Sequence, residues 1–180
     1  MVIIPKKTND FKMLSTAMRL LSTKHDHRPY ICYFFSDADG RMYKTDGHNL
    51  CRLLIDYDVP VLSFIDASKN TDGIMLDAVT LDNGIVDKAV STAAEVLSDL
   101  SDRTYLGRYR IDRKYEKQLI IDAISHIILT TGFVVDFMML HGVMRALSSA
   151  RQEFTVASDI NGVSISSPRF SFYTLKYVTE

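Results

Sequence analysis

The chain has 180 residues, of which 47% are hydrophobic and 24% are charged, so it is long enough to bury a core and is not wholly disordered. Its formal net charge of -1 gives no global attraction to nucleic acid, so any DNA-binding surface has to be local. These values predict one ordinary domain over residues 1–180.

Neither export nor a membrane span is expected. The opening MVIIPKKTND lacks the long apolar core of a signal peptide, and no apolar run approaches the roughly 20 residues that cross a bilayer. The two cysteines, Cys32 and Cys51, lie in strand-like runs and are expected to be reduced core thiols. We therefore expect a cytoplasmic protein.

A pattern near the N-terminus returns near the C-terminus. The run VII at residues 2–4 is followed by Asp10, and the run IIL at residues 127–129 is followed by Asp136, 126 residues after Asp10. Each aspartate precedes four apolar residues at the same helical spacing: Phe11, Leu14, Met18 and Leu21 in the first copy, and Phe137, Leu140, Met144 and Leu147 in the second. Each copy predicts a strand followed by a helix that buries these residues.

A matching turn follows each predicted helix. FFSDADGRMY in the first copy corresponds to VASDINGVSI in the second, and Asp37 and Asp159 are 122 residues apart. An aspartate accepts hydrogen bonds from nearby backbone N–H groups, and the glycines that follow, Gly40 and Gly162, permit positive φ. The sequence thus predicts an α+β fold from a duplicated strand-helix-strand-strand-strand unit, with both helices on one face of a curved antiparallel sheet. Copy one covers about residues 1–60 and copy two about 126–180.

The region between the copies, about residues 66–125, is interpreted as an insertion with two helices. One follows Asp82-Asn83-Gly84 and is expected to bury Val86, Val90, Ala93 and Leu97. The other follows Asp112 as its N-cap and is expected to bury Tyr115, Leu119, Ala123 and Ile127. A strand is expected between them at Tyr105 to Ile111. No function is predicted for this region.

The stretch KTDGHNL, from Lys44 to Leu50, resembles the bacterial DNA polymerase III β sliding clamp family, whose domains contain a strand ending in Thr-Asp-Gly-His-Arg-Leu. The resemblance covers residues 1–56 and 127–180 and implies a DNA-clamp-like fold. Three features differ from the family. Asn49 replaces an Arg, the closing Met-Pro-Met-Arg-Leu has no counterpart in residues 175–180, and the chain holds about one clamp domain where the bacterial subunit has three.

The resemblance implies a binding pocket at this stretch. Thr45, Gly47, His48 and Leu50 match family residues that help to bind a short apolar peptide from DNA polymerases and clamp loaders. Glycine permits close backbone approach, and a histidine ring offers two nitrogens beside an apolar floor. The alternative is that Asp46-Gly47 only forms a turn at the end of a strand.

The resemblance also implies a DNA-facing side on the two repeat helices, which line the inside of clamp rings. Lys12, Thr16, Arg19 and Thr23 share the side opposite the apolar stripe of the first helix. His141, Arg145 and Ser148 share that side of the second helix, with Gln152 just beyond. We expect sequence-independent contact with the phosphates of double-stranded DNA through Lys12, Arg19, Thr23, His141, Arg145 and Ser148. The alternative is an ordinary solvated helix face.

No catalytic, metal or cofactor site is expected. His25-Asp26-His27 lacks the further ligands of a zinc site, and Asp37-Ala38-Asp39-Gly40 lacks the acidic residue that ends a calcium loop. The glycines stand singly, without a phosphate-binding loop or nucleophile motif. An unrecognised active site would require a deep pocket with convergent titratable groups.

Two hypotheses remain. The first is a non-catalytic, sliding-clamp-like processivity or docking factor that associates with DNA and with polymerase or clamp-loader-like proteins. The second is a clamp-fold interaction or structural module that does not encircle DNA. Because the chain holds about one clamp domain, encircling DNA would require a homo-oligomer joined through sheet edges.

Overall fold

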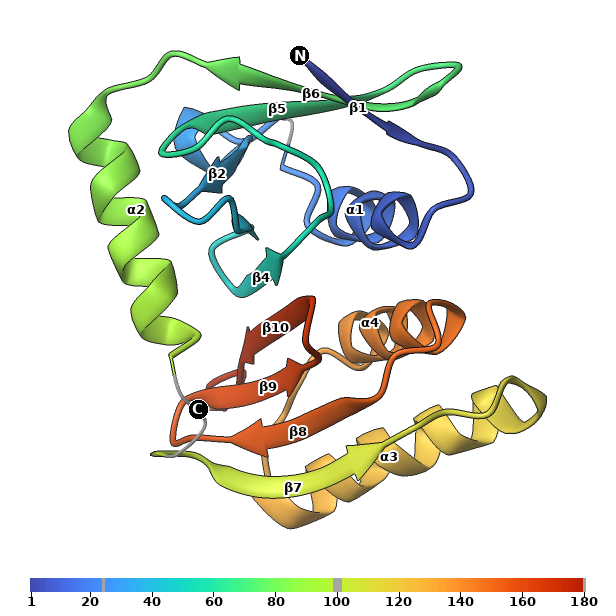
Figure 1. Cartoon of the computed structure of the whole chain (residues 1–180). Helices are drawn as coiled ribbons and strands as arrows, with labels where there is room; N and C mark the ends of the chain where they lie inside the picture. The colour runs from blue at the N-terminus through green and yellow to red at the C-terminus, as the bar shows by residue number, and fades with distance from the viewer. Residues whose placement is uncertain (24, 99–101, 180) are drawn as a thin grey trace.

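A computed structural model describes residues 1–23, 25–98 and 102–179 as one sheet with helices on both faces (Figure 1). Within these residues the helices are α1 (Asn9–Leu20), α2 (Asn83–Val96), α3 (Glu116–Thr131) and α4 (Phe137–Ser149). The strands are β1 (Val2–Pro5), β2 (Phe34–Ser36), β3 (Met42–Thr45), β4 (Asn49–Leu53), β5 (Phe64–Lys69), β6 (Gly73–Val79), β7 (Thr104–Tyr109), β8 (Phe154–Ser158), β9 (Gly162–Ser166) and β10 (Phe170–Leu175). Short 3-10 helices occur at Pro29–Ile31 and Arg113–Tyr115. No helix among the described residues is long and apolar enough to cross a membrane.

The sheet has ten strands in the order β1-β6-β5-β2-β3-β4-β10-β9-β8-β7, and the paired strands are antiparallel. The units β1-α1-β2-β3-β4 and β7-α4-β8-β9-β10 meet at the β4–β10 pair, where Leu53 is opposite Phe170 and Leu50 is opposite Tyr173. The β5–β6 hairpin lies between β1 and β2, whereas β7 pairs directly with β8. The predicted α+β fold with an internal duplication is confirmed.

The first strand of the second copy is β7, and the strand predicted at residues 127–129 is wrong. Those residues lie inside α3, which buries Ile120, Ala123, Ile124 and Ile127. Apolar residues at this spacing form one stripe of a helix, and α3 ends at Gly132, which has φ 69°. A short apolar run taken alone does not distinguish a strand from a buried helix segment.

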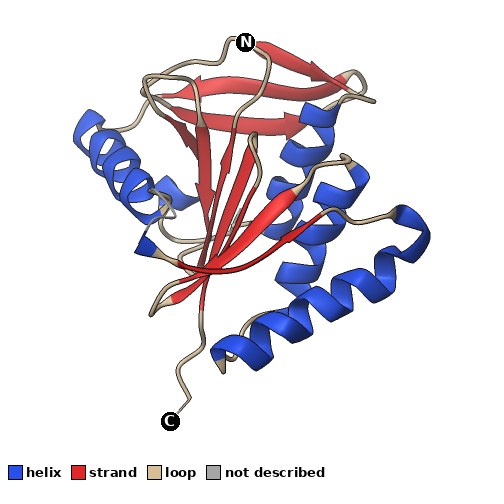
Figure 2. Cartoon of the chain, turned by 60° about the horizontal axis from the view of Figure 1, so that its bottom comes forward, coloured by secondary structure: helices blue, strands red, loops and turns tan. Residues whose placement is uncertain are grey.

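The two repeat helices lie side by side on one face of the sheet, as predicted, and α3 lies beyond α4 (Figure 1). Figure 2 shows the strands between these three helices on one side and α2 on the other. The main core forms under the three-helix layer, from residues such as Leu14, Leu140, Ile124 and Phe172.

The buried stripes differ from the prediction at several positions. In α1, Met13, Leu14, Ala17 and Leu21 are buried, whereas Phe11 and Met18 are half-buried. In α4, the predicted Leu140, Met144 and Leu147 are fully buried, but Phe137 is 42% exposed. The two helices differ because α4 packs between α1 and α3, whereas α1 has a helix on one side only.

The two predicted hairpin turns are present, with different roles for their glycines. In the first, Asp37 accepts hydrogen bonds from the N–H groups of Asp39 and Arg41, and Gly40 has φ 77°. In the second, Asp159 accepts hydrogen bonds from the N–H groups of Asn161 and Gly162. Gly162 does not have positive φ: a Cβ there would lie 2.1 Å from the carbonyl oxygen of Thr174 on β10. Close strand approach, not turn conformation, requires this second glycine.

The region predicted as an insertion, about residues 66–125, contains the predicted helices, but it overlaps the second copy because β7 belongs to that copy. Asp82 caps α2 by accepting a hydrogen bond from the N–H of Gly84, and Val86 and Ala93 are buried while Val90 and Leu97 are half-buried. Asp112 caps the 3-10 helix that precedes α3. The predicted burial of Tyr115 is wrong, since it is 56% exposed at the end of this short helix, where the turn differs from that of an α-helix.

Candidate functional site

The KTDGHNL stretch forms the end of the β3–β4 hairpin. The side chain of Asp46 accepts hydrogen bonds from the N–H groups of His48 (2.9 Å) and Asn49 (2.7 Å), and Gly47 has φ 90°. The hydroxyl of Thr45 donates to the carbonyl of Asn49 and accepts from the N–H of Gly47. The stretch is therefore a tight turn, as one reading of the sequence predicted.

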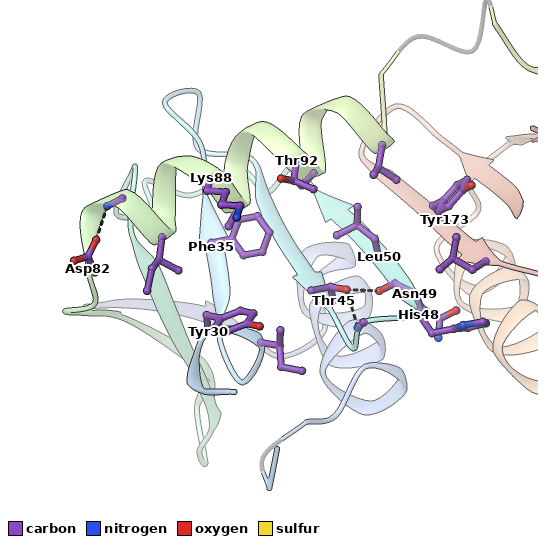
Figure 3. A pocket seen from close by; sticks show the side chains of 18 residues that line it. Tyr30, Phe35, Thr45, His48, Asn49, Leu50, Asp82, Lys88, Thr92 and Tyr173 are labelled. Atoms are coloured by element: carbon purple, nitrogen blue, oxygen red, sulfur yellow. Dashed lines mark hydrogen bonds between the residues drawn. The ribbon is translucent and has the colours of Figure 1, made fainter. Parts of the chain in front are cut away.

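The same hairpin also borders a groove of about 800 Å³, which Figure 3 shows from close by. The hairpin residues of the groove include all four of the predicted pocket residues, Thr45, Gly47, His48 and Leu50. Helix α2 forms the opposite wall through Ile85, Lys88, Ala89, Thr92, Ala93 and Val96. Tyr30, Ile31, Phe35, Tyr173 and Leu175 complete most of the lining. The structure thus brings the predicted pocket residues together, and it adds a helix that the sequence analysis did not assign to the site.

The interior of the groove is mostly apolar. Phe35 and Leu50 belong to a second, smaller core cluster under α2, together with Val86 and Ala93. The ring of Phe35 stacks on that of Tyr43, with centroids 5.5 Å apart. Polar side chains also line the groove, among them Thr45 on the hairpin and Asp82, Lys88 and Thr92 at α2 (Figure 3). An apolar surface with few polar groups binds an apolar ligand and fixes its orientation.

His48 lies at one end of the groove. Its ring stacks on the ring of Tyr177, with centroids 4.5 Å apart. Its Nε2 atom is buried and has no hydrogen-bond partner among the described residues. The backbone of Tyr177 is held by a hydrogen bond from its N–H to the carbonyl of Val134 (2.8 Å). The C-terminal residues of this chain therefore pack on the hairpin.

A buried lysine supports the groove from behind. Lys44 donates hydrogen bonds from Nζ to the hydroxyl of Thr23 (2.7 Å) and to the carbonyl of Ile31 (2.6 Å), and Ile31 lines the groove. Burial lowers the pKa of Lys44 below its ordinary value. On the same strand pair, Cys51 is fully buried, and burial raises the pKa of its thiol to about 12. Cys32 follows the 3-10 helix Pro29–Ile31 and does not lie in a strand.

Asn49, at the position of the family's Arg, is 4% exposed. Its side-chain amide donates a hydrogen bond to Asp46 (2.9 Å), while its Oδ1 has no partner among the described residues. Because side chains alternate along a strand, Asn49 and Cys51 point to the face opposite Leu50. The Asn49 side chain therefore helps to hold the turn.

The predicted DNA-facing residues have different environments. Lys12, Arg19 and Arg145 are exposed on α1 and α4, and none forms an ion pair within the described parts of the chain. His141 is half-buried beside Phe137. Thr23 lies beyond the end of α1, and its hydroxyl contacts Lys44 and Ile31, so its predicted place on the exposed helix face is wrong.

Ser148 is 1% exposed, so its predicted place on the solvated face is wrong. The contact of α4 with α3 as well as with α1 explains why a position opposite the main stripe is covered. Moreover, Phe137 and Met138 are exposed on this same helix.

No metal-binding group is evident in the described residues, where no cluster of three or more His, Cys, Asp or Glu is placed to hold an ion. Asp26, between the two histidines considered above, instead accepts hydrogen bonds from Arg28, which hold its pKa at about 2. In the Asp37 turn, Arg41 pairs with both Asp37 (2.8 Å) and Asp39 (2.9 Å). Arginine thus contacts the carboxylates in both segments.

Comparison with known proteins gives similar folds at low identity. No family model matches the chain, and no curated protein matches it. Three solved structures that are similar to the chain are sliding-clamp subunits, the family that the KTDGHNL stretch resembles. One is a putative DNA polymerase III beta subunit from Eubacterium rectale, at 11% identity and a TM-score of 0.48 over 99% of this chain. The second is the DNA polymerase sliding clamp from Pseudomonas aeruginosa, solved with a ligand, at 10% identity and a TM-score of 0.46 over 95% of this chain. The third is the DNA polymerase III beta chain from Streptococcus pneumoniae, at 12% identity and a TM-score of 0.41 over 94% of this chain. The matches span 65%, 64% and 64% of those longer chains.

Proposed function

We propose that the chain is a non-catalytic docking module of the sliding-clamp type, and that its groove binds a short apolar segment of a partner protein. One observation carries this proposal. Thr45, Gly47, His48 and Leu50 line a single groove, and α2 of the same chain closes that groove. The binding surface therefore requires no second copy of the chain.

The dimensions of the groove favour an extended peptide. The wall from Asp82 to Val96 follows the length of α2, which at about 1.5 Å per residue is roughly 21 Å. An extended peptide advances about 3.3 Å per residue, so roughly six residues would fill it. β3 and β4 are interior strands of the sheet, so the peptide binds through its side chains and does not add a strand.

The chemistry of the groove favours alternate apolar side chains in that peptide. Phe35 and Leu50 line the apolar floor of the groove, and the small side chains of Ala89 and Ala93 line its facing wall. The resemblance of the KTDGHNL stretch to sliding clamps suggests DNA polymerases or clamp-loader-like proteins as the source of such a segment. Large apolar anchors in a desolvated pocket supply most of the affinity of such complexes.

The helix layer carries a second candidate function, sequence-independent contact with double-stranded DNA. Lys12, Arg19 and Arg145 are exposed on neighbouring helices and are available for phosphate contacts. Encircling DNA in this way requires several copies, joined head to tail through the sheet edges β1 and β7. The exposed Phe137 and Met138 favour the alternative, an interaction module that does not encircle DNA.

Selection of random displayed ten-residue peptides on the immobilised protein tests the docking function. We expect the enriched sequences to converge on apolar residues at alternate positions, because these match the floor of the groove. A selection that yields no converging sequence contradicts the docking function.

A further inference from the structure

A second hollow of about 350 Å³ adjoins the apolar groove at the C-terminal end of α2. The linings of both cavities include Val96, Tyr173 and Leu175, so the hollow lies beside this end of the groove. Among the described residues, the others that line the hollow are polar: Glu95, Ser98, Asp102, Arg103, Asp159 and Asn161. The end of the groove beside the hollow is therefore polar.

The single arginine of the hollow is already engaged by the protein. The Arg103 side chain is 8% exposed, donates a hydrogen bond to the carbonyl of Val96, and lies over the ring of Tyr173 at 5.1 Å from its centroid. Its Nε is 3.9 Å from an oxygen of Asp159. Its charge is therefore directed at Asp159 and Tyr173.

Asp159 is engaged as well. Besides the turn N–H groups, it accepts a hydrogen bond from the phenol of Tyr173 (2.9 Å), and burial together with this bond raises the pKa of Tyr173. The other two carboxylates of the hollow belong to Glu95 and Asp102, and both residues are exposed. Neither is paired with a cation within residues 1–23, 25–98 and 102–179. The other end of the groove carries one charge of each sign, Asp82 and Lys88.

We propose that the peptide bound in the groove carries a lysine or arginine directly beyond its apolar segment, and that this cation lies between Glu95 and Asp102. The inference rests on the proposed docking function and adds the charge of the partner. The long aliphatic stem of either residue packs along Val96 and Leu175, while the cationic head stays hydrated beside the carboxylates. Complementary charge at the rim of an interface fixes the direction in which a ligand lies.

The test uses synthetic ten-residue peptides that share one apolar core from the display selection and carry Lys-Lys, Ser-Ser or Glu-Glu at either end. Their dissociation constants are measured by fluorescence anisotropy with the whole chain. We expect the Lys-Lys peptide with the flank at one particular end to bind about three- to tenfold more tightly than the Ser-Ser peptide, the range for two solvated ion pairs. Glu-Glu at that end should weaken binding, and about 0.5 M salt should reduce both effects.

Two variants separate charge from structure. Glu95→Gln with Asp102→Asn should abolish the lysine preference, so that the Lys-Lys and Ser-Ser peptides bind this variant with equal affinity. Asp87→Asn, on an exposed position of α2 outside both cavities, is the matched control and should keep the preference. Equal affinities of the Lys-Lys and Ser-Ser peptides for the wild-type chain would overturn the inference and leave the docking function standing. Failure of every core peptide to bind would overturn both.

Discussion

Leu20 of α1 packs directly against Gly142 of α4, so that a Cβ built on Gly142 would lie 2.9 Å from one methyl group of Leu20 and 3.2 Å from the other. The two repeat helices approach closely at this point because one of them has no side chain there. The contact sets the distance between α1 and α4.

We therefore expect Gly142→Leu to destabilise the protein by about 1–3 kcal/mol, the usual cost of overpacking a core. Gly142→Ala should be much milder, because the end of the Leu20 side chain can move aside and alanine favours the helix. Urea unfolding of both variants measures the difference. Equal stability of Gly142→Leu and the wild type would show that the helices are not in contact there.

The two equivalent methionines should differ in their contribution to stability. Met144 is fully buried, so Met144→Ala should cost about 2–5 kcal/mol, whereas Met18 is half-buried and Met18→Ala should cost clearly less. Chemical denaturation of both variants tests this order. Equal losses would mean that Met18 is buried as deeply as Met144, as the apolar spacing in the sequence predicts.

Stability at alkaline pH should depend on Lys44. Because burial lowers its pKa in the folded state, the unfolded chain binds more protons than the folded chain at pH values between the lowered pKa and the ordinary value of 10.5. The stability contributed by Lys44 therefore rises as the pH rises through this interval. The Cys51 thiol, with a pKa of about 12, stays protonated there.

The measurement is the free energy of unfolding of the wild type and of Lys44→Met from about pH 8 to about pH 10.5. The difference, wild type minus variant, should increase with pH. A difference that stays flat or falls would show that Lys44 is not buried with a lowered pKa.

DNA binding, if it occurs through the helix layer, should depend on two arginines. Arg19→Glu together with Arg145→Glu should weaken binding to a short duplex by about tenfold or more, because phosphate contacts carry sequence-independent affinity. Both residues are exposed, so the double variant should remain folded. Lys69→Glu on β5 with Arg110→Glu just after β7, both at exposed positions, is the control. Weak binding that survives the first double variant at two salt concentrations would leave only the interaction-module alternative.

The duplication could be predicted from the sequence because its features are local. Asp37 and Asp159 each form a turn, so their spacing identified equivalent positions. Asp10 in the first turn of α1 and Asp136 at the N-cap of α4 both mark the start of a repeat helix. The hairpin residues of the groove were predicted differently, from the resemblance of the KTDGHNL stretch to the sliding-clamp family.

The errors concern long-range packing. The short apolar run at residues 127–129 is compatible with a strand and with a helix, and only contacts with neighbouring elements decide between the two. Ser148 is covered because α3 packs against α4, a contact that no local pattern shows. The α2 wall of the groove was not predicted for the same reason, because α2 is distant in the sequence from the hairpin that it faces.

The most direct test of the docking function fills the groove with a side chain. Ala89 of α2 lines the groove, whereas Ala94 of the same helix is exposed and does not. Ala89→Trp and Ala94→Trp make the same chemical change, and isothermal titration with a peptide from the display selection measures both. We predict that Ala89→Trp weakens binding by about tenfold or more and that Ala94→Trp stays within about twofold of the wild type. Equal affinity of the two folded variants for that peptide would contradict the account, because the peptide would then bind outside the groove.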